Sequence, residues 1–358
     1  SGDYVHKNLR MVIIQGMFEP LIGLVIGLSF ALVLFLGGKR VILATMSMGD
    51  FVAFNSYLGL LIWPMIAIGW VINLYQRGKA SLTRIMEVFE QKPQITDLPD
   101  AKSVEKFWGE IEFRNLTFRY KPELEPVLRN ISFHIDAGQF VGITGRTGSG
   151  KTTLISLLPR LFDPPDNTIF IDGNDIRRIK LSSLRGAIAL VPQDSFLFST
   201  TLMENIKFGN PEAGDDEAIA ASRIAQFHKD VKNFPDGYNT LIGERGVTLS
   251  GGQKQRLAIA RAILLDPPIL ILDDALSAVD TETEEEILEA LKKIRAGKTT
   301  LVVSHRISAL QEADIVVVLR KGEIAEIGAP QNLLQQAGYY AELYRMQQIQ
   351  SELNDVQK

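Results

Sequence analysis

Two long apolar runs open the chain. They cover residues 20–38 and 51–76, and neither contains a charged side chain. A helix crosses the hydrocarbon core of a bilayer in about 20 residues, so each run is long enough to span it. A buried helical hairpin of a soluble protein is the alternative, but two uncharged runs of this length favour the membrane. The pattern predicts membrane helices at about residues 12–38 and 51–76.

Basic side chains flank this hairpin unevenly. More of them stand outside the two runs than in the connection between them: Lys7, Arg10, Arg77, Lys79 and Arg84 against Lys39 and Arg40. Because cytoplasmic segments are enriched in Lys and Arg, we expect both outer ends of the hairpin in the cytoplasm. Gly59 and Gly69 of the second run would allow another helix to approach closely.

The composition changes after the hairpin, which predicts a second domain. We expect the membrane part to cover residues 1–90 and a proline-containing linker to cover residues 91–108. The second domain should then occupy residues 109–346, and a polar tail residues 347–358. The fold class that this predicts is an α-helical transmembrane hairpin followed by an α/β domain.

Short strands begin the second domain. The stretch "GEIEFRNLTFRY" sets Ile111, Phe113, Leu116 and Phe118 among polar residues, which is typical of a half-buried strand. The stretch "VLRNISFHIDAGQFVGITG" adds two strands around a turn at residues 136–138. We therefore expect the domain to open as an antiparallel sheet.

The stretch "GRTGSGKT", residues 145–152, has the spacing of a phosphate-binding P-loop. An apolar strand at residues 140–144 precedes it and a helical run at residues 152–158 follows it, which is the context such a loop requires. Its backbone N–H groups would surround phosphate oxygens, Lys151 would reach the terminal phosphates, and Thr152 would supply an oxygen to Mg²⁺. The predicted ATP-binding residues here are Gly145, Arg146, Thr147, Gly148, Ser149, Gly150, Lys151, Thr152 and Thr153.

Two adjacent carboxylates follow the apolar run "ILIL". Residues 269–272 are typical of a buried parallel strand, and Asp273 and Asp274 come directly after them. Ligands of open α/β sheets bind at the carboxyl ends of the strands. We therefore expect Asp273 to hold Mg²⁺, through water, as nucleotide hydrolases require of such a carboxylate.

Composition excludes several other classes of protein. The chain has no cysteine, which rules out disulfides, thiolate metal sites and a cysteine nucleophile. Its net charge of -4 is made of interspersed acidic and basic residues, so there is no basic face for nucleic acid. A soluble ATPase of nucleic-acid maintenance would need such a face or a long coiled-coil insertion, and the membrane runs argue against it.

The stretch "TLSGGQKQRLAIARAIL", residues 248–264, resembles the signature sequence of ATP-binding cassette (ABC) transporters, and the whole chain resembles an exporter half. Ser250 can cap the helix that follows it, and a helix N-terminus approached by glycines binds anions. The resemblance implies a helical signature subdomain whose Ser250, Gly251, Gly252 and Gln253 bind ATP held by the P-loop of an opposing subunit.

The same resemblance implies roles for five more residues. Tyr120 would stack on adenine, and His305 would contact the γ-phosphate as the switch histidine. Gln193 would bind the metal with Thr152 and Asp273, and the catalytic set would be Asp274, His305, Gln193 and Asp280. The stretch "GERG", residues 243–246, is similar to an exporter loop that touches the intracellular ends of membrane helices.

Asp274 departs from the family pattern, in which glutamate follows the Mg²⁺ aspartate and orients the attacking water. The aspartate side chain is shorter by one C–C bond, about 1.5 Å, and a misplacement near 1 Å costs about 10²-fold in rate. We expect the P-loop site to bind ATP and to hydrolyse it slowly, as in one half of a heterodimer. A homodimer, or a regulatory half in which ATP binding is mainly structural, is the alternative.

The resemblance also implies a location and a substrate class. The protein would lie in the cytoplasmic membrane as a multi-pass protein with its nucleotide-binding domain in the cytoplasm, and would export a drug-like or lipid-like amphipath. An exporter half has six membrane helices where this sequence predicts two, so we expect the sequence to be a piece of a longer chain.

Overall fold

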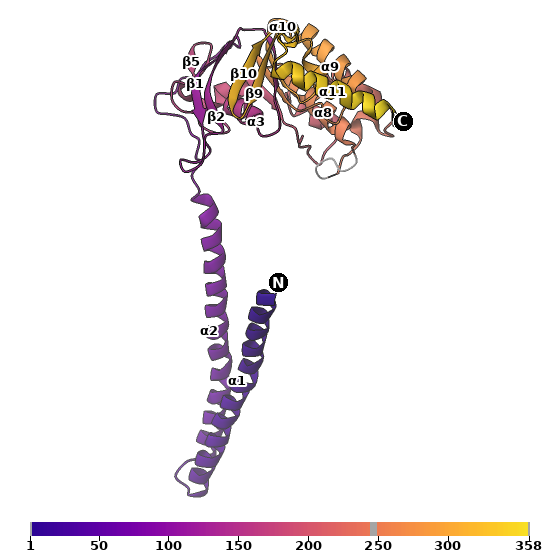
Figure 1. Cartoon of the computed structure of the whole chain (residues 1–358). Coiled ribbons are helices and arrows are strands. Elements are labelled where there is room, and N and C mark those ends of the chain that lie inside the picture. Colours follow the sequence, from indigo (N-terminus) through magenta and orange to yellow (C-terminus); the bar gives the residue numbers. More distant parts are fainter. Residues whose placement is uncertain (1, 244–248, 357–358) are drawn as a thin grey trace. The chain divides into compact units, whose positions relative to one another are not determined.

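The computed structural model describes residues 2–243 and 249–356, and the chain forms two compact units. The first unit covers Ser1–Pro93 and the second Gln94–Lys358. Figure 1 shows the first unit as a helical hairpin and the second as a layered domain of helices and sheets. An α-helical hairpin followed by an α/β domain is thus confirmed as the fold class.

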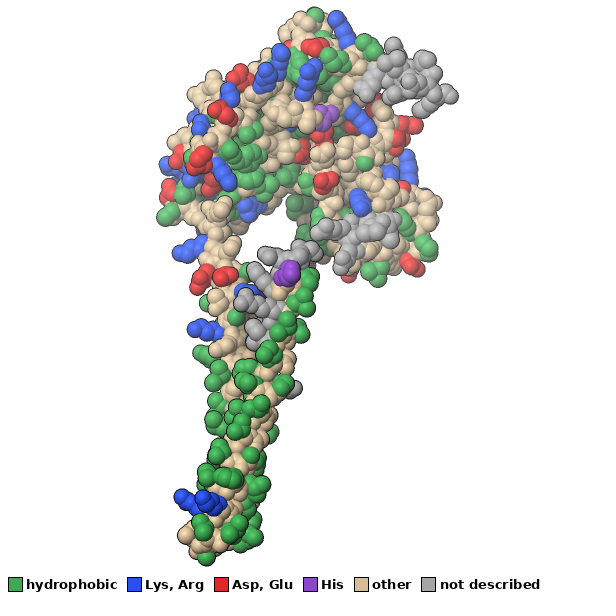
Figure 2. All heavy atoms as spheres, turned by 60° about the horizontal axis from the view of Figure 1, so that its bottom comes forward, with side chains coloured by type: hydrophobic (Ala, Val, Ile, Leu, Met, Phe, Trp, Pro, Cys, Tyr) green, Lys and Arg blue, Asp and Glu red, His purple; other side chains and the backbone are tan. Residues whose placement is uncertain are grey.

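The hairpin consists of α1 (Gly2–Ile42) and α2 (Met48–Phe89). Both helices are long and apolar enough to cross a membrane, and Figure 2 shows apolar side chains along the hairpin. Ser47 caps α2 by accepting a hydrogen bond from the backbone N–H of Asp50 at 3.0 Å. Both helices run beyond the predicted membrane spans: α1 begins before residue 12 and ends after residue 38, and α2 begins before residue 51 and ends after residue 76.

Close approach within the hairpin occurs at a glycine that the sequence did not single out. A Cβ atom at Gly37 would lie 2.8 Å from the ring of Phe51 on α2, so a side chain there would push the helices apart. At Gly59 and Gly69 a Cβ atom would meet no atom within 4 Å. These two glycines are therefore not the points of close approach between α1 and α2, and their approach to other membrane helices stays a prediction.

The second unit contains two sheets. The smaller sheet has the strand order β2-β1-β4-β5 and is antiparallel; its strands are β1 (Ile111–Phe118), β2 (Leu128–Ile135), β4 (Ile169–Ile171) and β5 (Asn174–Asp175). The larger sheet has the order β10-β9-β3-β8-β7-β6 and is parallel except for β10; its strands are β3 (Phe140–Thr144), β6 (Ile188–Val191), β7 (Ile269–Asp273), β8 (Thr299–Val303), β9 (Ile315–Arg320) and β10 (Glu323–Gly328).

The predicted opening of the domain is correct for β1 and β2 and wrong for β3. The turn at residues 136–138 does not fold a third strand back onto β2; it sends the chain into the middle of the parallel sheet, where all five residues of β3 are buried. Strand β1 also contains a bulge, with Asn115 at φ 46°, between Phe113 and Leu116. The bulge allows these two residues, three positions apart, to face the same core.

Helices cover the parallel sheet, and several of them pack against one another beside it. Those with the most bearing on the site are α3 (Lys151–Leu157), α8 (Gly251–Leu265), α9 (Thr281–Ile294) and α11 (Tyr339–Val356). The others are α4 (Leu181–Gly186), α5 (Leu202–Lys207), α6 (Asp215–Ile224), α7 (His228–Val231) and α10 (Pro330–Gln335), with short 3₁₀ turns at Ile176–Arg178, Gly237–Asn239 and Ser308–Leu310. Figure 1 shows α8, α9 and α11 on the side of the unit away from β1 and β5.

The segment predicted as a polar tail begins inside a helix. Helix α11 starts at Tyr339, where Tyr340 and Ala341 are buried, and the helix continues through Val356. Burial of its first turn provides the packing that stabilises a helix of otherwise polar composition.

Candidate functional site

The loop between β3 and α3 has a backbone that only glycine tolerates at several positions. Gly145, Gly148 and Gly150 have φ angles of 146°, 81° and 102°. A Cβ atom at Gly145 would lie 2.2 Å from the carbonyl oxygen of Leu319, and one at Gly150 would lie 2.7 Å from the side chain of Leu128. The glycines therefore set a tight curve directly before the N-terminus of α3, which favours an anion.

Two side chains of this loop are suited to phosphate. Lys151 is buried, and its Nζ donates hydrogen bonds to the carbonyl oxygens of Gly145 at 2.9 Å and Arg146 at 3.4 Å. Burial lowers the pKa of Lys151, while Asp274 and Asp273 act in the opposite direction. The Ser149 hydroxyl is buried with no hydrogen-bond partner among the described residues. An unsatisfied hydroxyl and a desolvated ammonium beside curved backbone fit a phosphate group.

The remaining loop residues lie at the surface or beside it. Arg146, Thr147 and Gly148 are exposed, and Arg146 lies 3.7 Å from the carboxylate of Glu342 on α11. Thr153 is buried, and its hydroxyl lies 2.8 Å from the hydroxyl of Tyr120. Tyr120 is therefore next to the loop, with the edge of Phe162 against it in a T-shaped contact at 4.9 Å between ring centroids.

Thr152 and Asp273 lie together at the edge of the parallel sheet. The Thr152 hydroxyl donates to the Asp273 carboxylate at 3.3 Å, and Asp273 is the last residue of β7. Burial raises the pKa of Asp273, and the hydrogen bond from Thr152 opposes this. A hydroxyl and a carboxylate are the two-oxygen set that Mg²⁺ accepts when it keeps several waters and binds phosphate oxygens.

The structure does not bring the Gln193 side chain into this pair. Gln193 lies in the loop after β6 and is exposed. Its described hydrogen bond is made by its backbone carbonyl, which accepts from the Gln255 side chain at 3.5 Å. Because β6 and β7 are parallel neighbours, Gln193 follows the same edge of the sheet as Asp273. Its role in binding metal stays a prediction.

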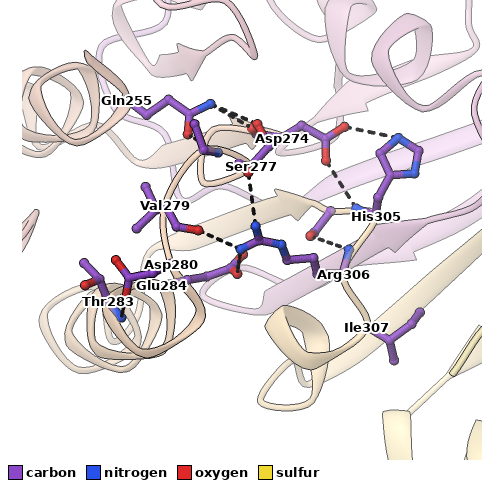
Figure 3. A network of polar contacts seen from close by, with 12 residues as sticks. Gln255, Asp274, Ser277, Val279, Asp280, Thr283, Glu284, His305, Arg306 and Ile307 are labelled. Carbon is purple, nitrogen blue, oxygen red and sulfur yellow. Dashed lines mark hydrogen bonds and ion pairs between the residues drawn. The ribbon is translucent and has the colours of Figure 1, made fainter. Parts of the chain in front are cut away.

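Asp274 faces His305, as Figure 3 shows. The backbone N–H of His305 donates to Oδ1 of Asp274 at 3.2 Å, and Nε2 of His305 lies 3.3 Å from Oδ2. Asp274 is buried and has φ 46°, a left-handed conformation that aspartate tolerates better than most residues. Its own N–H donates to the carbonyl oxygen of Val303 on β8 at 3.0 Å. Both partners therefore come from the segment that begins at β8.

The predicted signature residues form the start of α8. Ser250 is the N-cap, and its hydroxyl accepts from the N–H of Gln253 at 3.3 Å, while the Gln253 side chain accepts from the N–H of Ser250 at 3.0 Å. This capping box confirms that Ser250 caps the helix. Gly251 is exposed, and a Cβ atom at Gly252 would lie 2.7 Å from the carbonyl oxygen of Ala278. Close packing thus requires glycine in the first turn.

Two other predicted residues have structural partners. The Gln253 amide donates to Asp230 at 3.0 Å, so its side chain is held within the domain. Asp280 caps α9 by accepting from the N–H of Thr283 at 2.9 Å, and this hydrogen bond lowers the pKa of Asp280. Their roles towards nucleotide stay predictions. Of the predicted loop at residues 243–246, residues 244–246 lie outside the described residues.

Sequence reasoning missed a buried glutamine that joins the signature helix to the carboxylate loop. The Gln255 amide donates to the hydroxyl of Ser277 at 3.0 Å and to the carbonyl of Asp274 at 3.4 Å, and its oxygen accepts from the N–H of Ala278 at 2.9 Å. The helical periodicity of the sequence places Gln255 on the inner face of α8. This was a signal that could have been used, because a buried polar side chain needs hydrogen-bond partners.

An ion pair beside His305 was also missed. The Arg306 guanidinium donates to the Glu284 carboxylate at 2.7 Å and to the carbonyl oxygens of Val279 at 2.8 Å and Ser277 at 3.1 Å. Figure 3 shows it directed away from Asp274, towards α9. Arg306 therefore fixes the segment after His305 to the segment that carries Asp280.

Comparison with known proteins gives two family matches. The ABC transporter model matches residues 128–277, and the model of the ABC transporter transmembrane region matches residues 2–65. A relative in Bacillus subtilis, described as "Probable multidrug resistance ABC transporter ATP-binding/permease protein", is 45% identical over 349 residues, which are 98% of this chain and 60% of that protein.

A second relative and a solved structure agree with this. An ATP-dependent lipid A-core flippase of Syntrophus aciditrophicus is 42% identical over 343 residues, 96% of this chain and 57% of that protein. A structure of a bacterial Atm1-family ABC exporter with ATP bound matches with a TM-score of 0.83 and 34% identity, over 96% of this chain and 60% of that one. The chain thus spans about 60% of the length of the curated relatives it matches.

Proposed function

The chain belongs to the ABC transporters, as a membrane protein with an exporter-type transmembrane region fused to a cytoplasmic ATP-binding domain, and from this premise we propose that it drives export by hydrolysing ATP. The observation that carries the proposal is the pair Thr152–Asp273, 3.3 Å apart, beside the buried Lys151 and the glycine loop. This arrangement has the groups that phosphoryl transfer requires, because the ammonium of Lys151 neutralises phosphate charge and the hydroxyl and carboxylate would hold a Mg²⁺ ion against the phosphates.

Each part of the site has a distinct task in this proposal. The loop and Lys151 bind the β- and γ-phosphates, and Thr152 and Asp273 would hold Mg²⁺, which would supply positive charge against the phosphates. Tyr120 packs against the adenine, and its hydroxyl contact with Thr153 ties that ring to the loop. His305 approaches the γ-phosphate, and Gln193 senses it from the neighbouring loop.

The exposed start of α8 supports a second subunit. Gly251 and the capped N-terminus of α8 form an anion site apart from the P-loop, and a single domain uses one nucleotide. We infer that ATP lies between the P-loop of one subunit and Ser250, Gly251, Gly252 and Gln253 of the other. ATP binding then closes the dimer and hydrolysis opens it, which moves the membrane helices.

The partner is proposed to be a different exporter half. His305 lies against both carboxylate oxygens of Asp274, and the side chain is shorter than glutamate by about 1.5 Å, so it reaches less far towards an attacking water molecule. A partner with glutamate at this position would supply the fast site, completed by the signature of this chain. The alternatives are a homodimer and a half whose ATP binding is regulatory.

The proposed substrate is an amphipathic drug or lipid. The relatives named above are described as a multidrug resistance transporter and a lipid flippase.

Purification of the assembled transporter from its native cell tests this proposal. Equal amounts of this chain and a second half, with ATP-dependent export by the reconstituted pair and none when Lys151 is replaced by Met, are the expected results. Recovery of this chain alone with full ATPase activity would refute the heterodimer and leave the exporter. Export that persists with Lys151→Met would favour the regulatory half.

A further inference from the structure

The side-chain amide of Gln347 makes two hydrogen bonds to the backbone of residues 305–307. Its oxygen accepts a hydrogen bond from the N–H of Ile307 at 2.9 Å, and its nitrogen donates to the carbonyl oxygen of His305. Gln347 lies on α11, within the segment that the sequence predicted to be a tail. One side chain thus satisfies both a donor and an acceptor on either side of Arg306.

His305 depends on its backbone for its position. Its side chain is 43% exposed, so the ring is held by little packing and by the contact of Nε2 with Oδ2 of Asp274 at 3.3 Å. On the side towards β8, the N–H of His305 donates to Asp274, and the N–H of Ser304 donates to Ile143 at 3.1 Å. On the other side, Gln347 of α11 makes hydrogen bonds to the backbone of His305 and of Ile307. The carbonyl of His305 is therefore held from α11 and its N–H from the carboxylate loop.

Helix α11 is firmly attached to the domain core. Tyr340 is completely buried, and burial raises the pKa of its hydroxyl to about 12. The Glu326 carboxylate on β10 accepts hydrogen bonds from the N–H groups of Tyr339 and of Tyr340, the latter at 3.0 Å. Gln347 follows Tyr340 by two helical turns and so lies on the same face. The side-chain amide of Gln347 is therefore carried by a helix that is packed onto the domain core.

We propose that Gln347 is a positioning residue of the ATPase: it holds the backbone of residues 305–307 so that the His305 imidazole meets the γ-phosphate. This inference rests on the proposed function, because it presumes that His305 contacts ATP. The physical reason is that two hydrogen bonds fix the peptide groups around one residue, and removing them frees the ring to leave the phosphate. ADP lacks that phosphate, so its binding should not depend on Gln347.

The test compares ATP and ADP binding by the assembled transporter and by its Gln347→Ala variant. Two lost hydrogen bonds of ordinary strength correspond to about tenfold in ATP affinity, and we expect that loss with ADP affinity unchanged. Gln347→Glu keeps the acceptor for Ile307 and loses the donor to His305, so it should fall between wild type and alanine. Gln331→Ala, the same change at an exposed position on α10, serves as the matched control.

The outcomes distinguish a failure of the proposed role of Gln347 from a failure of the proposed function. If Gln347→Ala lowers ATP and ADP affinity equally, or lowers only the melting temperature, Gln347 is structural and the inference is wrong. An unchanged ratio of ATP to ADP affinity in both variants would also overturn it, while ATP hydrolysis by the wild type would still support the proposed function. If the wild type binds neither nucleotide, the proposed function itself fails.

Discussion

His305 engages both carboxylate oxygens of Asp274, one through its backbone N–H at 3.2 Å and the other through Nε2 of its ring at 3.3 Å. The residue proposed to orient water and the residue proposed to contact the γ-phosphate are therefore in direct contact, with a hydrogen bond from the backbone N–H of His305. A glutamate at position 274 would extend past the backbone N–H by about one C–C bond, 1.5 Å. The effect of side-chain length at position 274 on ATP hydrolysis can therefore be tested.

Replacing Asp274 with Glu should raise the rate of hydrolysis at this P-loop. A gain of about 10- to 100-fold is expected, because a misplacement near 1 Å costs about 10²-fold and the left-handed backbone is less favourable for Glu. Single-turnover hydrolysis of radiolabelled ATP by the assembled transporter measures it. Asp274→Asn, which keeps the length and removes the charge, is the control and should show no gain. An unchanged rate in Asp274→Glu would mean that length is not limiting.

Replacing Lys151 with Met should abolish stabilisation by ATP. For the wild type, ATP at 100 times its Kd should raise the melting temperature by about 5–10 °C. Without the ammonium, the phosphates lose their charge partner and this rise should disappear. The melting temperature without ATP should not fall much, since burial of the charge is itself unfavourable, as the lowered pKa of Lys151 indicates. A normal rise in the variant would place the nucleotide elsewhere.

Ser250→Ala should weaken the ATP-dependent contact between subunits. The cap is worth about 1 kcal/mol of helix stability, and its loss loosens the exposed end of α8. Thr201→Ala is a matched control, because Thr201 caps α5 with an equivalent capping box. Both variants should lose similar thermal stability, but only Ser250→Ala should reduce ATP-induced dimer closure, measured by cross-linking of the two ATP-binding domains. If Ser250→Ala and Thr201→Ala affect closure equally, Ser250 contributes only to the stability of the fold.

Glu284 should make stability depend on pH. Burial raises the pKa of Glu284 above its ordinary value of 4.5, although the ion pair with Arg306 opposes this. The folded protein therefore binds this proton more readily than the unfolded chain. The stability from this group is complete below the ordinary pKa and is lost as pH rises through the raised one.

Glu284→Gln removes that titration and isolates its contribution. As pH rises from about 4.5 to 7, the melting temperature of the variant should gain on that of the wild type. Glu289→Gln, at an exposed position on the same helix, is the control, because the ion pair with Lys293 lowers the pKa of Glu289 and reverses the trend. Parallel curves of melting temperature against pH for the wild type and for Glu284→Gln would contradict the raised pKa of Glu284.

Local sequence patterns predicted the elements that surround the phosphate loop. The strand at residues 140–144 and the buried parallel strand ending in Asp273 are confirmed, since a short apolar run bounded by glycine, proline or aspartate has few alternatives. The cap at Ser250 is confirmed for a similar reason, because its partner Gln253 is only three residues away. The chemical roles of these residues stay predictions.

Contacts between distant segments could not be predicted from the same patterns. The placement of β3 depends on pairing with β8 and β9, more than 150 residues away in sequence. Gln347 contacts His305 across 42 residues of sequence, and nothing in a polar helix marks which glutamine will meet a backbone. The alternation in β1 hid a bulge because its polar residues fit either register.

The order of these residues along the chain also has a consequence for synthesis. Gln347 is made 42 residues after His305, and at about 5–20 residues per second the ribosome needs about 2 to 8 s to add them. The growing chain therefore contains the phosphate loop and His305 for seconds before the glutamine that holds the backbone of residues 305–307. Because β9, which pairs with β3, is also made after His305, the loop and this backbone can reach their final arrangement only late in synthesis.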